Sequence, residues 1–194
     1  MTDVLIVGGG PAGLSAALFT AKNGLDTAVF DTDGTWMHKA HLFNYPGIGS
    51  VDGSAYMATL RDQVDDFGVE RHQEEVTAVE ATDDGLVVAT DADEHAADYV
   101  VLATGANRDL AEDLGCAMTD EDVVDVGVTM ETSVENVYAT GAMVRVEEWQ
   151  AVISAGDGAA AALNILSKEK GENFHDFDTP ATAEEVLGSL VDGE

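Results

Sequence analysis

One stretch near the start of the chain, residues 4–33, constrains the fold more than any other. It reads VLIVGGGPAGLSAALFTAKNGLDTAVFDTD. A short apolar run, Val4–Val7, is typical of a buried parallel strand, and a second apolar run, Thr27–Phe30, follows a segment rich in small residues. Between the two runs stand three glycines in the G-x-G-x-x-G spacing, at positions Gly8, Gly10 and Gly13. This order predicts a strand, a helix and a second strand around a turn that binds a dinucleotide.

The residues of this turn have separate physical roles. Gly8 permits the tight turn, Gly10 lets the backbone approach a pyrophosphate, and Gly13 lets the helix lie close to the strand. Pro11 presets the first helical turn, and Ala12 keeps the helix thin where it packs. The helix start presents free N–H groups and the positive end of its dipole. We therefore expect the phosphates of a nucleotide to lie over this turn.

An acidic residue stands where the second strand ends. Asp31 follows Gly13 at about the twenty-residue distance at which a carboxylate accepts hydrogen bonds from ribose hydroxyls. Its negative charge disfavours a phosphate at the 2′ position of that ribose. Asp31 and the adjacent Thr32 are therefore predicted to bind the cofactor; an incidental acid beside a structural turn is the alternative.

The composition limits the class of protein. A chain of 194 residues with 45% hydrophobic residues can bury one core, so we expect a single domain over residues 1–175 and a peripheral tail over 176–194. The 38 acidic and 8 basic residues give a formal net charge of -30, which repels nucleic acid. Such an acidic surface is typical of a halophilic protein, and a docking face for a basic partner is the alternative.

The cysteine count and the start of the chain bear on redox chemistry and location. Cys116 is the single cysteine, which excludes an intramolecular disulfide and a C-x-x-C pair, and we expect it to be a small buried side chain. No positively charged leader precedes the first apolar run, and that run breaks at Gly8. The sequence therefore predicts a cytoplasmic protein that is not bound to a membrane.

The rest of the chain alternates between helical and strand patterns. Asp52 or Ser54 is a candidate cap for a helix that ends before Gly68, and Asp83-Asp84-Gly85 indicates a hairpin turn. The predicted elements are helices over 52–67 and 150–167, strands over 75–81, 85–90, 99–103, 123–126 and 137–139, and a short helix over 184–190.

Several separated motifs carry a resemblance to a known family. They are Gly8-Gly9-Gly10-Pro11-Ala12-Gly13, Asn44-Tyr45-Pro46-Gly47, Ala103-Thr104-Gly105, and Thr132-Ser133 through Val137-Tyr138-Ala139-Thr140-Gly141 followed by Gln150-Ala151. Over most of residues 3–167 the chain resembles the FAD domain of low-molecular-weight thioredoxin reductases and related disulfide oxidoreductases. The resemblance implies an α/β, Rossmann-like FAD-binding fold of three layers, with a parallel sheet and a small β-hairpin or meander.

The resemblance also implies a place for each part of FAD. Asp31 would hold the adenosine ribose, and the backbone around Val76 would hold the adenine. The helix start at the pyrimidine edge of the isoalloxazine ring would stabilise negative charge on the reduced flavin. The other implied contacts are Asn44 near the flavin, Thr104 and Gly105 along the cofactor, and Gln150 and Ala151 at the pyrimidine edge.

The chain departs from the family pattern in two places. The family inserts an NADPH domain with a redox cysteine pair after the Ala-Thr-Gly strand, whereas residues 105–136 span only about thirty positions and hold no second glycine fingerprint. The final motif usually ends in Gly-Asp, whose carboxylate accepts a hydrogen bond from the ribityl chain, and here it is Gly141-Ala142. Losing one charge-assisted bond of about 1.5–3 kcal/mol would weaken FAD binding roughly tenfold to a hundredfold. Gly141 and Ala142 are still expected to contact the cofactor.

Histidines and tryptophans are further candidates near the flavin. His38 and His41 could share one helical face, either as surface residues or as a proton relay, and a metal site would need further ligands. Trp36 and Trp149 could shield the isoalloxazine ring or make ordinary packing contacts. No residue qualifies from the sequence as a catalytic acid, base or nucleophile.

Three functions remain open at this point. The leading hypothesis is a single-domain FAD flavoprotein that transfers electrons with a separate partner protein. The second is a non-catalytic subunit or sensor that holds FAD or ADP with weakened flavin affinity. The third is a small dehydrogenase that binds NAD, which leaves the residues after 132 without a use. The surface that an inserted domain would cover also suggests a homodimer or partner docking.

Overall fold

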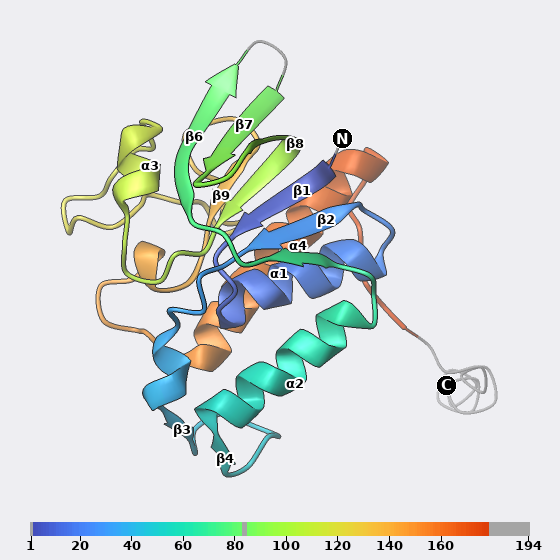
Figure 1. Cartoon of the computed structure of the whole chain (residues 1–194), viewed down its shortest axis with the longest axis vertical. Coiled ribbons are helices and arrows are strands. Elements are labelled where there is room, and N and C mark those ends of the chain that lie inside the picture. The colour runs from blue at the N-terminus through green and yellow to red at the C-terminus, as the bar shows by residue number, and fades with distance from the viewer. Residues whose placement is uncertain (1, 83–84, 179–194) are drawn as a thin grey trace, which may run out of the picture.

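The computed structural model describes residues 2–82 and 85–178, and Figure 1 shows a twisted sheet with long helices packed along one side. Seven strands form this sheet in the order β5-β2-β1-β8-β7-β6, and β9 pairs with β8. The strands are β1 (Thr2–Val7), β2 (Thr27–Phe30), β5 (Glu70–His72), β6 (Val76–Thr82), β7 (Gly85–Thr90), β8 (Glu94–Leu102) and β9 (Val137–Ala139). The predicted α/β class with a mostly parallel sheet is confirmed.

The central strand β1 separates two cores. Its side chains alternate between the two faces of the sheet, as in any strand. Val4 and Ile6 pack with apolar residues of the long helices, whereas Leu5 and Val7 pack with the meander and with the segment that follows β8. Because β1 pairs in parallel with β2 and β8, it is buried on both faces, which explains its continuous apolar sequence.

Strand β8 joins the parallel and antiparallel parts of the sheet. Residues 94–97 pair antiparallel with β7, and residues 100–102 pair in parallel with β9. Strands β6 and β7 form the predicted antiparallel pair, although Asp83 and Asp84 of the expected turn lie outside the described residues. The result is a parallel sheet extended by a small meander.

The helices are α1 (Pro11–Lys22), α2 (Gly53–Asp65), α3 (Asp109–Asp113) and α4 (Ala151–Lys170), with short 3-10 helices η1 (Trp36–Lys39) and η2 (Gly141–Val144). A small two-stranded sheet contains β3 (His41–Leu42) and β4 (Val51–Asp52). The Asp52 carboxylate accepts hydrogen bonds from the backbone N–H groups of Ser54 and Ala55, at 2.9 and 3.3 Å, so Asp52 is the cap of α2.

Helices α1 and α4 pack closely because glycines stand where the backbones meet. A Cβ atom on Gly158 of α4 would collide with the backbone oxygen of Ala12 in α1. A Cβ atom on Gly13 would likewise collide with the backbone oxygen of Gly8. Figure 1 shows the two helices side by side under the sheet. Glycine at these positions therefore fixes how near each helix lies to its neighbour.

Two predicted elements need comment. The strand expected over 123–126 is wrong, because Val124 forms only an isolated bridge with Met118. The N–H of Val124 instead donates to the backbone oxygen of Met143 in η2, at 3.1 Å, so no ladder continues along this segment. The short helix expected over 184–190 lies outside the described residues.

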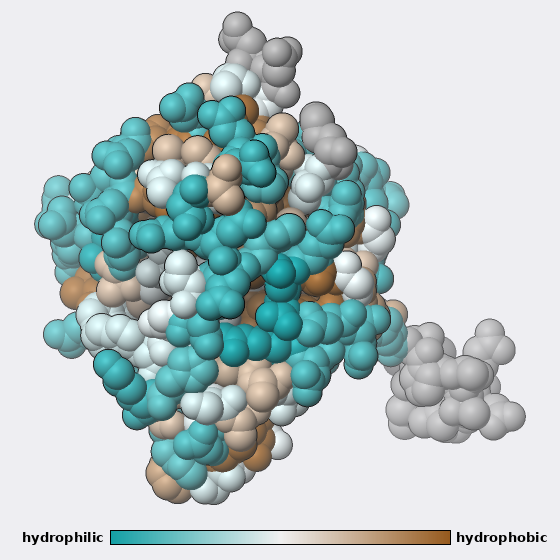
Figure 2. Space-filling view, in the orientation of Figure 1, coloured by the Kyte–Doolittle hydropathy of each residue, from teal (hydrophilic) through white to brown (hydrophobic). Residues whose placement is uncertain are grey.

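The surface is strongly hydrophilic. Figure 2 shows hydrophilic residues over most of one face, with apolar residues also exposed at the lower tip near β3 and β4. Of the helices in the described ranges, none combines the length and the apolar character needed to cross a membrane. Lys22 at the end of α1 pairs with Asp176 and Asp178, at 2.7 and 2.5 Å, so residues at the start of the predicted tail contact the domain.

Candidate functional site

A cavity of about 820 Å³ opens at the carboxyl ends of the parallel strands. This is where ligands bind in open α/β sheets, and the volume is of the size that holds small molecules and cofactors. Thirteen of the predicted site residues line the cavity: Gly8, Gly10, Pro11, Ala12, Asp31, Thr32, Val76, Thr104, Gly105, Gly141, Ala142, Gln150 and Ala151. The structure thus brings together residues that are up to 143 positions apart (151 minus 8).

The glycine turn forms the floor of one end of the cavity. Gly8 has a φ of +108°, in the region that favours glycine, and a Cβ atom there would collide with the backbone oxygen of Ala103. A Cβ atom on Gly9 would lie 2.5 Å from Oδ2 of Asp31. Gly13 lies beneath the turn and does not line the cavity, which agrees with its expected role in packing. A side chain at Gly8 or Gly9 would therefore displace its neighbours.

Two helix N-termini border the cavity. The N-cap residues, Gly10 of α1 and Gln150 of α4, make no side-chain capping hydrogen bond, and neither first turn contains an acidic residue. Helix α2, by contrast, is capped by Asp52. The first N–H groups of α1 and α4 are thus available for an anionic ligand, and each helix dipole favours negative charge at this end.

Beside Asp31, the ring of Phe30 and the carboxylate of Glu74 line the cavity, and two histidine rings pack behind Phe30. The ring of Phe30 stacks on His72 with centroids 4.6 Å apart and meets the ring of His95 at the same distance. Glu74 lines the cavity and accepts a hydrogen bond from the Thr90 hydroxyl at 2.8 Å. Val76 lies beside this group, at the end predicted to hold adenine.

The opposite end is formed by two segments that are far apart in sequence. Nδ2 of Asn44 donates a hydrogen bond to Oε1 of Gln150 at 2.7 Å. Asn44 does not itself line the cavity, so its predicted influence on the flavin would act through Gln150. The rings of Trp36 and Trp149 meet edge to face with centroids 6.0 Å apart, and both line the cavity. The two segments therefore hold each other across the cavity edge.

Sequence reasoning missed several lining residues. Glu75 and Thr77 flank Val76, Glu74 precedes Glu75, and Thr35 follows the acidic end of β2. Ser154 lies four residues after Gln150, so helical periodicity could have found it. The Thr104 hydroxyl is already used, because it donates to the backbone oxygen of Asn107 at 2.7 Å.

The histidine and cysteine predictions have separate outcomes. His38 lies in η1 and His41 in β3, so the expectation that they share one helical face is wrong. Within residues 2–82 and 85–178, no group of three or more His, Cys, Asp or Glu side chains could hold a metal ion. Cys116 is buried, as expected, and burial raises the pKa of its thiol.

Comparison with known proteins bears directly on this site. A family model described as pyridine nucleotide-disulphide oxidoreductase matches residues 2–45 and 46–156. The thioredoxin reductase of Peptoclostridium litorale is 34% identical over 118 residues, which cover 59% of this chain and 36% of that protein. The thioredoxin reductase of Listeria monocytogenes is 26% identical over 206 residues, which cover 96% of this chain and 63% of that protein. The chain thus spans less than two thirds of the length of these relatives.

Solved structures support the same fold. A thioredoxin reductase from Gloeobacter violaceus aligns with a TM-score of 0.82 at 21% identity, over 92% of this chain and 98% of that chain. Members of the family bind FAD, which is the cofactor expected from the sequence. The glycine turn and the two helix starts without side-chain caps fit a ligand that carries a pyrophosphate and a ring that becomes negatively charged when it is reduced. This chain belongs to the pyridine nucleotide-disulphide oxidoreductase family and contains its thioredoxin-reductase-like FAD domain.

Proposed function

We propose that this protein is a single-domain flavoprotein that exchanges electrons with a separate partner protein, which acts as donor or acceptor. The observation that carries the proposal is the exposed edge of the cavity at the end predicted to hold the flavin. The side chains of Trp36 and Trp149 line this edge and are 72% and 42% exposed. A partner could therefore approach the ring without a rearrangement of the core.

The residues of the cavity would bind and orient FAD, which supplies reversible two-electron transfer when bound. The start of α1 would hold the phosphates, and Asp31 would accept hydrogen bonds from the adenosine ribose. The start of α4 would stabilise negative charge at the flavin ring, with Gln150 held in place by Asn44.

A separate partner is needed because the chain offers no second redox group of its own in the described ranges. The segment after Gly105 folds as α3 and a connector that packs on the sheet, and not as a nucleotide-binding domain. Cys116 belongs to this segment and is buried in the core beside the sheet, so its thiol is shielded from exchange.

A second function is favoured by one specific observation. Ala142 stands at the cavity wall where the family usually has an aspartate for the ribityl chain. Weakened flavin binding would suit a non-catalytic subunit or sensor that holds FAD or ADP. This alternative predicts the same cavity but no electron transfer.

The first experiment is the visible spectrum of the protein purified in molar salt, followed by denaturation and identification of the released nucleotide. The flavoprotein proposal predicts a yellow protein that releases FAD. Chemical reduction should bleach the spectrum, and a redox partner isolated with the protein should restore it. Bound FAD that no partner oxidises or reduces would favour the non-catalytic function, and preferential binding of NAD would contradict both.

A further inference from the structure

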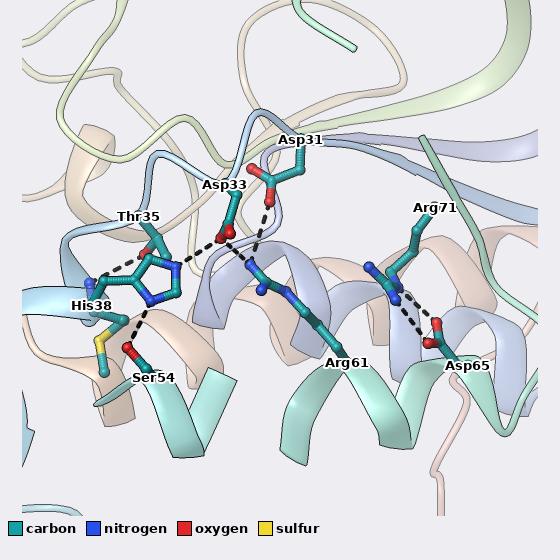
Figure 3. Close-up of polar contacts among 9 residues, drawn as sticks. Asp31, Asp33, Thr35, His38, Ser54, Arg61, Asp65 and Arg71 are labelled. Atoms are coloured by element: carbon teal, nitrogen blue, oxygen red, sulfur yellow. Dashed lines mark hydrogen bonds and ion pairs between the residues drawn. The ribbon is translucent and has the colours of Figure 1, made fainter. Parts of the chain in front are cut away.

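An ion-pair network lies directly behind the acidic end of β2 (Figure 3). Nη2 of Arg61, which projects from α2, lies 3.7 Å from Oδ2 of Asp31 and pairs with Oδ1 of Asp33. Nε2 of His38 contacts the same Asp33 oxygen at 2.7 Å, and Nδ1 of His38 contacts the Ser54 hydroxyl at 2.9 Å. The guanidinium of Arg61 thus pairs with two carboxylates, those of Asp31 and Asp33.

The position of Asp31 depends on this network. Its Oδ2 atom faces both Arg61 and the backbone of Gly9, where only the absence of a side chain leaves room for it. In Figure 3 the other carboxylate oxygen points away from Arg61. The Asp31 and Arg61 side chains are only 23% and 21% exposed, so their attraction is screened less than that of a surface pair. Asp31 is therefore held with one oxygen engaged and the other free to accept a hydrogen bond.

Arg61 has no substitute at this place. Among the residues that the structure describes, it is the only ion-pair partner of Asp31. Arg71 lies nearby, but its Nε and Nη2 atoms are bound to the two oxygens of Asp65, at 2.6 and 2.7 Å. Without Arg61, the Asp31 and Asp33 carboxylates would repel each other in a chain that has only 8 basic residues. Rotation of Asp31 away from the cavity would relieve that repulsion.

We propose that Arg61 is a positioning residue that holds Asp31 for the ribose 2′-hydroxyl of the adenosine half of the cofactor, and so sets the preference of the cavity for an intact ribose. The inference rests on the proposed binding of FAD. It extends the site to α2, which lines no part of the cavity. Asp33 and His38 complete the arrangement, because they hold Arg61 and the loop after β2 in one position.

The test compares dissociation constants for FAD and for an FAD analogue with a 2′-deoxyadenosine, within each variant. The wild-type protein should prefer FAD roughly tenfold to a hundredfold, the range expected for one hydrogen bond to a charged group. Asp31→Ala should abolish the preference. Arg61→Met should reduce it to about threefold or less, and Arg61→Lys should restore part of it, because a lysine can still pair with Asp31. Arg71→Met is the matched control, because Arg71 is hydrogen-bonded to Asp65 and acts on Asp31 only through its charge, and it should keep most of the wild-type preference.

The ratio of the two dissociation constants distinguishes a positioning role from a general loss of stability. A variant that is merely less stable loses affinity for both ligands equally, and the ratio does not change. A wild-type ratio in Arg61→Met, alongside a lost ratio in Asp31→Ala, would overturn the role of Arg61 and leave the FAD proposal intact. A ratio of about one in the wild-type protein would overturn both roles at the ribose. Failure of the wild-type protein to bind FAD at all would refute the proposed function, and this inference with it.

Discussion

The two ends of the cavity are built in different ways. At the end predicted to hold the adenosine half of FAD (the adenosine end), the glycine turn and Asp31 lie where β1, β2 and α1 meet, and Gly8 and Gly9 leave no room for a side chain. At the end predicted to hold the flavin (the flavin end), the wall depends on side chains of separate segments, such as the hydrogen bond from Asn44 to Gln150. The backbone of the first end is fixed by the sheet and α1, whereas the second end depends on contacts between exposed segments.

This difference indicates which part of the site can change without loss of the fold. A substitution at the glycine turn must disturb the strands or α1, so its cost appears in stability. A substitution in η2, for example at Ala142, would change a predicted contact with the cofactor and leave the sheet unaltered. We therefore expect members of this family to differ in their affinity for the cofactor, or in their partner protein, through changes at the flavin end.

The largest predicted effect is on stability, and it comes from disrupting the contact between α1 and α4 beneath the adenosine end. Gly158→Ala should lower the free energy of unfolding by about 3 kcal/mol, because the new Cβ atom would collide with the Ala12 backbone and push α4 from α1. Gly156→Ala is the control, since no atom lies within 4 Å of its Cβ position, and it should raise stability by about 0.5–1 kcal/mol. Denaturant unfolding at fixed salt measures both. Equal effects of the two substitutions would show that the α1–α4 contact does not determine stability.

The next effect is at the flavin end and should leave the fold unchanged. Ala142→Asp should strengthen FAD binding roughly tenfold to a hundredfold, because the carboxylate would accept the hydrogen bond that this chain lacks. Ala142→Asn, which is similar in size but neutral, should give a smaller gain. Calorimetric titration with FAD measures the change, and an equal unfolding midpoint confirms that the fold is preserved. Weaker binding in Ala142→Asp would place the ribityl chain elsewhere.

The same comparison explains what the sequence could predict. Gly8 and Asp31 belong to one strand–helix–strand unit, so local spacing was enough to find them. Asn44 and Gln150 are far apart in the chain, and only the resemblance to a family placed them together. Arg61 was missed because its pairing with Asp31 depends on how α2 packs against α1, which no local sequence pattern encodes.

The wrong predictions have a related cause. Residues 123–126 have an apolar sequence suited to a strand, but the neighbouring backbone is the turn at η2, which offers Val124 a single acceptor. His38 and His41 have helical spacing, but η1 ends at Lys39 and an extended segment follows. In both places the tertiary neighbours decided the backbone conformation.

The smallest predicted effect is the contribution of the Asp33 carboxylate to stability, which tests whether the rigid adenosine end extends beyond Asp31. His38, and then Arg61, lower the pKa of Asp33 from its usual value of 3.8. An acid with a lowered pKa in the folded state stabilises that state above its unfolded pKa, and the contribution is lost as the pH falls through the folded value. Because Asp33 is about half exposed, Asp33→Asn should cost no more than about 1 kcal/mol at pH 7.

That cost should shrink as the pH falls below 3.8 and through the lowered folded pKa of Asp33, because protonation then neutralises the wild-type carboxylate as well. Unfolding of both proteins in molar salt at pH 7 and at pH 3 provides the measurement. Asp120→Asn removes an exposed carboxylate from another part of the surface and should show no such pH-dependent difference. If the cost of Asp33→Asn is the same at both pH values, the side chain acts by packing and not by charge. The ion pairs would then not belong to the rigid end of the cavity, and the loop after β2 would resemble the flavin end in being held by exposed contacts alone.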